Sequence, residues 1–179
     1  ALRDVNNLRI MVHYLERNQR YIAKPDRAVA WHKHVIKLLE SFGDDGEVPP
    51  AWKKKYYRSH FICGTALFGA GKRDEGFEYI EKAFELCKQV AEVPENEPLD
   101  VGAEHLFGGI KLIPATGVIV LPDGGKDICS EWPYYFSSGY MYYAMTAKRG
   151  WEWFNSVRGD ERFIALIERA RKLAEEEKN

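Results

Sequence analysis

The central part of the chain holds small residues where two packed helices would meet. They are Gly64, Gly71, Gly76 and Ala83, and bulky apolar residues lie between them. Gly64 and Gly76 would let two helix backbones approach closely, and Gly71 would permit a tight turn between the helices. Ala83 would leave room for a following helix. The pattern therefore predicts two antiparallel helices joined by about four residues.

Apolar residues at three- and four-residue spacing predict further helices on both sides of this pair. The predicted helices cover residues 3–20, 25–42, 52–68, 74–87, 137–148 and 160–173. Two β-branched runs, 110–113 and 118–121, flank a short Pro and Gly-containing connection, which predicts a small β-hairpin or irregular insertion near residues 105–125. We expect a mostly α fold of about six helices, forming one domain over residues 1–179.

The charge balance bears on the partners of this chain. Lys and Arg number 26 and Asp and Glu number 27, for a net charge of −1. Proteins that bind duplexes neutralise many phosphates, so we expect no direct nucleic-acid binding by this chain. No apolar run approaches the roughly 20 residues that span a bilayer, so we expect a cytoplasmic protein without a membrane partner. Cys63, Cys87 and Cys129 are too scattered for a metal site or a disulfide framework, and reduced, packed thiols are expected.

Candidate catalytic residues are few. His60 and His105 are possible general bases, but the sequence places no identifiable nucleophile or acid beside either. We therefore expect no catalysis and no cofactor, and an enzyme with one of these histidines in an aromatic cleft is the less favoured alternative. We expect His32 and the lysine run 53–55 to lie on solvated helix surfaces.

Aromatic residues are concentrated between residues 132 and 154. They are Trp132, Tyr134, Tyr135, Phe136, Tyr140, Tyr142, Tyr143, Trp151, Trp153 and Phe154. A helix cannot turn Tyr140, Tyr142 and Tyr143 to one side, so at least one should be exposed or line a groove. Packing against the helix pair is the favoured interpretation. The alternative is a ligand or peptide surface that includes Tyr142 and Trp151.

The small-residue pattern resembles a tetratricopeptide repeat over about 34 residues. It departs from that repeat at His60, where a large aromatic residue is common, and at Lys88, where a proline is usual. With the segments 81–86 and 154–163, the order of elements over about residues 55–173 resembles the C-terminal regions of XRE-type helix-turn-helix transcriptional regulators from Gram-positive bacteria. The resemblance implies a tetratricopeptide-like superhelix and an N-terminal DNA-binding domain that precedes Ala1 in a longer protein.

The expected function is that of a non-catalytic regulatory or protein-interaction module. It would bind a protein or peptide partner, a second copy of itself or a small effector, and would act as the effector or oligomerisation half of a DNA-binding regulator. By the repeat positions, the binding face would present Arg58, Phe61, Thr65 and Phe68. A standalone scaffold or dimerisation protein is the alternative.

Overall fold

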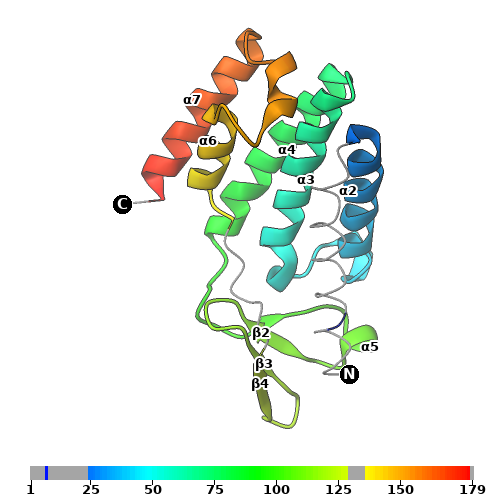
Figure 1. Ribbon diagram of the computed structural model, residues 1–179. Coiled ribbons are helices and arrows are strands. Elements are labelled where there is room, and N and C mark those ends of the chain that lie inside the picture. The colour runs from blue at the N-terminus through cyan, green and yellow to red at the C-terminus, as the bar shows by residue number, and fades with distance from the viewer. Residues whose placement is uncertain (1–6, 8–23, 129–135, 178–179) are drawn as a thin grey trace.

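The computed structural model describes residue 7, residues 24–128 and residues 136–177. Five helices stand side by side above a small sheet (Figure 1): α2 (Pro25–Glu40), α3 (Lys53–Gly69), α4 (Arg73–Ala91), α6 (Ser138–Thr146) and α7 (Glu161–Glu176). Helix α2 packs on α3, α3 on α4, and α6 on α7. The sixth α-helix of the described residues is the short α5 (Glu104–Phe107) beside the sheet. The expectation of a mostly helical chain is therefore confirmed.

The predicted helix pair is formed by α3 and α4. A Cβ atom added at Gly64 would lie 2.8 Å from the carbonyl oxygen of Gly76, and one added at Gly76 would lie 2.6 Å from the ring of Phe68. The turn between the helices has Gly71 in the left-handed region, with a φ of 78°. Ala83 is fully buried. The predicted roles of the two seam glycines and of the turn glycine are thus confirmed.

Helix α2 begins at Pro25, where a proline in the first turn leaves no intrahelical hydrogen bond unmade. Its buried residues Val35 and Leu39 face a core that includes Trp52. The connection to α3 contains two 3₁₀ turns, η1 (Asp44–Gly46) and η2 (Pro50–Trp52). Gly46 has a φ of 79°, which favours glycine at this bend.

The insertion is an antiparallel sheet of four short strands in the order β1-β2-β3-β4. The strands are β1 (Leu99–Asp100), β2 (Lys111–Ile113), β3 (Val118–Val120) and β4 (Lys126–Ile128). The predicted β-hairpin is β2–β3, in which Leu112 pairs with Ile119. The outer strands extend the sheet beyond residues 105–125. They were missed because they are only two and three residues long and carry no hydrophobic alternation.

A second core joins the helix pair to the C-terminal helices. Phe61 and Phe68 of α3 pack there with Phe154, which lies in the 3₁₀ segment η3 (Glu152–Ser156), and with Phe163 of α7. Asp160 caps α7 by accepting a hydrogen bond from the backbone N–H of Arg162. The Arg162 guanidinium also lies 2.9 Å from Asp74 of α4 and therefore ties the starts of the two helices together.

The predictions for the first helix, for the cysteines and for two surface residues have different outcomes. The predicted helix at 3–20 lies almost wholly outside the described residues, as does Cys129, whereas Cys63 and Cys87 are free and buried. His32 is only 3% exposed and Lys55 only 5% exposed, so the prediction that they lie on solvated surfaces is wrong. His32 is buried in α2 and Lys55 in the first turn of α3.

Within the described residues, no helix is both long enough and apolar enough to span a membrane.

Replacing Gly64 with alanine should destabilise the protein. Alanine in an exposed helix interior is normally more stable than glycine by about 0.5–1 kcal/mol. Here the added methyl group would meet the backbone of Gly76, so we expect Gly64→Ala to lower the unfolding free energy by about 1–3 kcal/mol. Chemical denaturation measures this difference.

Gly159→Ala is the matched control, because an added Cβ at Gly159 meets no atom within 4 Å. It should be neutral or stabilising by up to about 1 kcal/mol. If Gly64→Ala is as stable as Gly159→Ala, the backbones do not depend on this close approach.

Candidate functional site

The face of α3 that the repeat positions predicted as a binding face lies inside the protein. Phe61 is 0% exposed, Thr65 is 2% exposed and Phe68 is 1% exposed. The Thr65 hydroxyl donates a hydrogen bond to the backbone carbonyl of Phe61 at 2.8 Å. Arg58 is half-buried, with its guanidinium carbon 5.9 Å from the centre of the Phe136 ring. The prediction of an open face is therefore wrong for Phe61, Thr65 and Phe68, which are buried.

The C-terminal elements cover this face. Phe61 contacts the rings of Phe136, Trp151 and Phe154, and Phe68 contacts those of Phe154 and Phe163. Repeat positions alone could not anticipate this cover, because α6, η3 and α7 are separated from the helix pair in the sequence by the sheet insertion. The favoured interpretation of the aromatic segment, packing against the helix pair, is confirmed for its described residues that join this core.

Tyr142 and Trp151, the two candidate ligand residues of this segment, both lie half-buried against the same core. Trp151 is stacked on Phe154, with ring centres 6.0 Å apart. Tyr143 is 60% exposed, as expected for one of the three tyrosines of α6. Trp132, Tyr134 and Tyr135 lie outside the described residues.

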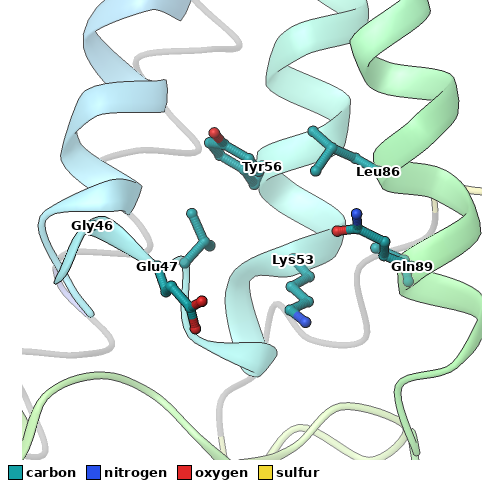
Figure 2. A pocket seen from close by; sticks show the side chains of 8 residues that line it. Gly46, Glu47, Lys53, Tyr56, Leu86 and Gln89 are labelled. Carbon is teal, nitrogen blue, oxygen red and sulfur yellow. The ribbon is translucent and has the colours of Figure 1, made fainter. Parts of the chain in front are cut away.

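An open cavity lies on a different face of α3. We call it the loop pocket: it has a volume of about 210 Å³ and is lined by Gly46, Glu47, Val48, Lys53, Tyr56, Leu86, Gln89 and Val90. Figure 2 shows Leu86 and Gln89 reaching from α4 towards α3, with Glu47 on the opposite side of the pocket. The pocket therefore joins the α2–α3 connection, the first turns of α3 and the end of α4.

The pocket combines apolar walls with a polar rim. Val48, Tyr56, Leu86 and Val90 supply apolar surface, and Tyr56 and Leu86 are half-buried. Lys53, at the start of α3, and the exposed Gln89 supply polar groups. Tyr56 is held in place because its hydroxyl donates a hydrogen bond to Glu40 of α2 at 2.7 Å. Burial of the ring, together with the Glu40 carboxylate, raises the pKa of the Tyr56 hydroxyl, which stays protonated.

The Tyr56 ring also belongs to a group of three rings that extends away from the loop pocket. We call this group the aromatic stack: Tyr56, His60 and Tyr79. The His60 ring centre lies 4.7 Å from that of Tyr56 and 5.4 Å from that of Tyr79. Above the stack, Lys33 of α2 forms an ion pair with Glu75 of α4, and its ammonium group lies 5.5 Å from the centre of the Tyr79 ring. Helices α2 and α4 are thus linked across α3 at this level, and the loop pocket opens below the link.

His60 is the exceptional member of the stack. It is 8% exposed, and neither ring nitrogen has a hydrogen-bond partner among the described residues. Burial, with a smaller contribution from the charge of Lys82, lowers the pKa of His60 to about 4. The ring is therefore neutral at pH 7, and two polar atoms are buried without the hydrogen bonds that normally offset their desolvation.

The histidines give little support to the enzyme alternative. That alternative requires a buried histidine with a carboxylate neighbour, and no carboxylate in the described part of the chain hydrogen-bonds to His60. His105 is exposed on α5. Burial raises the pKa of the Cys63 thiol to about 12 and that of Cys87 to about 11, so neither is a reactive thiolate. Within the described residues, no group of three or more His, Cys, Asp and Glu side chains is placed to hold a metal ion.

Sequence reasoning missed the loop pocket because three separate segments build it. A signal was nevertheless present in α4, where Tyr79, Lys82, Leu86 and Gln89 follow each other at three- and four-residue spacing. Such a stripe of mixed polar and apolar residues indicates a half-exposed helix face.

Comparisons with protein-family models, curated proteins and solved structures found no match. Function is therefore inferred from the site itself.

Replacing His60 with phenylalanine should stabilise the protein. The substitution removes two unsatisfied buried nitrogens and keeps a ring between Tyr56 and Tyr79, so the unfolding free energy at pH 7 should rise by about 1 kcal/mol or more. His105→Phe is the control: that side chain is exposed, and the change should stay within about 0.5 kcal/mol. An unchanged or lower stability of His60→Phe would show that the nitrogens are satisfied in solution.

The same histidine should make the wild-type protein sensitive to acid. Because the folded-state pKa of about 4 lies below the ordinary value of 6.5, the unfolded chain takes up the proton first as the pH falls. Wild-type stability should therefore decline between pH 6.5 and pH 4, by up to about 3 kcal/mol relative to His60→Phe. Urea denaturation across this pH range measures the difference, and parallel pH profiles would contradict it.

Proposed function

We propose that this chain is a non-catalytic protein-interaction module that binds a peptide segment of its partner in the loop pocket. The observation that carries the proposal is the pocket itself, an open cavity with apolar walls and a polar rim beside Tyr56 and Leu86. Its volume of about 210 Å³ is below the roughly 300–1,000 Å³ of pockets that enclose small molecules or cofactors. A cavity of this size suits one anchoring side chain of a longer ligand.

The composition of the pocket agrees with a peptide ligand. Protein interfaces combine a desolvated apolar centre with a polar rim. Leu86 and Val48 supply the centre, while Lys53 and Gln89 can bond to the backbone or polar side chains of a peptide. Tyr56 is anchored to Glu40 before any ligand binds, so little conformational freedom is lost at that residue on binding.

The wider proposal concerns the protein that contains this module. The α3–α4 pair is tetratricopeptide-like, supported by the seam at Gly64 and Gly76, and the helices around it form a degenerate superhelix of that kind. The module serves as the effector or oligomerisation half of a cytoplasmic XRE-type regulator, supported by the near-neutral charge and the order of elements. Partner binding would shift the DNA-binding half between two arrangements that differ in affinity for the partner.

The reading frame upstream of the Ala1 codon tests the wider proposal. An in-frame helix-turn-helix segment would support a DNA-binding regulator. A start codon immediately upstream of Ala1 would contradict it and would favour a standalone scaffold or dimerisation protein.

Selection of short random peptides displayed on phage tests the peptide site. Selected peptides are synthesised, and their affinities for the wild-type protein are measured by fluorescence anisotropy. Leu86→Asp places a charge in the apolar centre and should weaken binding at least roughly tenfold. Gln89→Ala removes the amide of an exposed rim residue without disturbing the core, and it should weaken binding several-fold.

Ile164→Asp is the matched control, because Ile164 is 54% exposed on α7 and lines none of the cavities described. It should leave peptide affinity unchanged, and circular dichroism confirms that each variant is folded. Failure to enrich any peptide would contradict the proposed function, as would equal affinity of the selected peptides for all four proteins.

A further inference from the structure

A second cavity adjoins the loop pocket on the side of the sheet. We call it the acidic pocket: it has a volume of about 400 Å³ and lies between residues 43–50 and the segment that leads from β1 into α5. Glu47 and Val48 line both cavities and therefore form their common rim. A ligand that places a side chain in the loop pocket has the acidic pocket directly beside it.

The charged residues that line the acidic pocket all have the same sign. They are Asp44, Glu47, Asp100 and Glu104, and no lysine or arginine lines the cavity. Asp100 has a partner at the rim, Lys111 at 3.5 Å. Within the described residues, Asp44, Glu47 and Glu104 form no ion pair. This local excess of negative charge contrasts with a chain whose overall charge is only −1.

The walls of the acidic pocket are part of the packed structure. The backbone N–H of Ala103 donates to the carbonyl of Phe42 at 2.7 Å, and the indole N–H of Trp52 donates to the carbonyl of Val101 at 2.7 Å. The Phe42 ring lies 5.4 Å from the rings of both Trp52 and Phe107. These contacts hold the two acidic walls at a fixed separation, so the cavity exists before any ligand arrives.

The arrangement of the carboxylates determines which cation suits the site. They do not converge as metal ligands do, since the described residues include no group of three or more acidic or other ligating side chains placed around one point. A long cationic side chain, lysine or arginine, can follow a spread of carboxylates while its methylene groups contact Val48 and Pro49. Low-dielectric walls around like charges also attract a cationic ligand during its approach.

We propose that the partner peptide carries a lysine or arginine next to its apolar anchor, with the anchor in the loop pocket and the cation in the acidic pocket. This inference rests on the proposed function, because it names the chemistry of the ligand at the same site. The shared rim at Glu47 and Val48 places the two side chains within a few residues of each other in the peptide.

The experiment uses the peptides selected by display, each synthesised with its basic residues or with glutamine in their place. Basic residues should be enriched beside the apolar anchor, and replacement by glutamine should weaken binding about fivefold at low ionic strength. The double variant Asp44→Lys/Glu104→Lys should weaken binding of the basic peptide to a similar extent and abolish the difference between the two peptides. Raising the salt concentration should reduce the wild-type preference.

Glu78→Lys/Glu81→Lys is the matched control, since it makes the same charge change at exposed positions of α4 that do not line the cavity. It should retain the preference for the basic peptide. Selected peptides that require Leu86 but show neither basic residues nor sensitivity to Asp44→Lys/Glu104→Lys would overturn this inference and leave the proposed function standing. Failure to select any peptide would overturn both.

Discussion

The close approach of α3 and α4 at Gly64 and Gly76 is the constraint on which the other features depend. Side chains at these positions would separate the helices, because an added Cβ at Gly64 meets the backbone of Gly76 at 2.8 Å. With the helices this close, Phe68 and Phe77 meet across the seam, with ring centres 5.0 Å apart. The pair presents one face to the C-terminal helices and another to the α2–α3 connection.

Helix α3 is buried on nearly every side, and each side has a different neighbour. Its contacts with α6, η3 and α7 are aromatic and buried, whereas Tyr56 faces the loop pocket together with residues of α4. The sheet packs below, where Leu112 and Ile119 share a core with Trp52 just before α3 begins. The acidic pocket arises because the sheet and the α2–α3 connection are attached to this same core.

The aromatic stack combines two opposing properties. Tyr56 and Tyr79 pack on the His60 ring and exclude water from it, which stabilises the apolar part of the ring. The same exclusion leaves both His60 nitrogens without partners in the segments that the structure describes, which destabilises the folded state. Proteins often retain such local costs beside sites that bind ligands. The stack lies directly behind the Tyr56 wall of the loop pocket.

Elements that depend on local spacing could be predicted from the sequence. The seam of Gly64 and Gly76 predicted the helix pair, and the two β-branched runs predicted the β2–β3 hairpin, because backbone sterics and side-chain periodicity are local properties. The exposed face of α3 could not be predicted in this way, because it depends on packing between segments that are distant in the chain. Buried residues lie nearly all round this helix, so hydrophobic periodicity alone does not distinguish the Phe61 face from the Tyr56 face. The segment from α6 to α7 buries Phe61. Residues 46–48, on the other side of the helix, leave Tyr56 at the wall of the loop pocket.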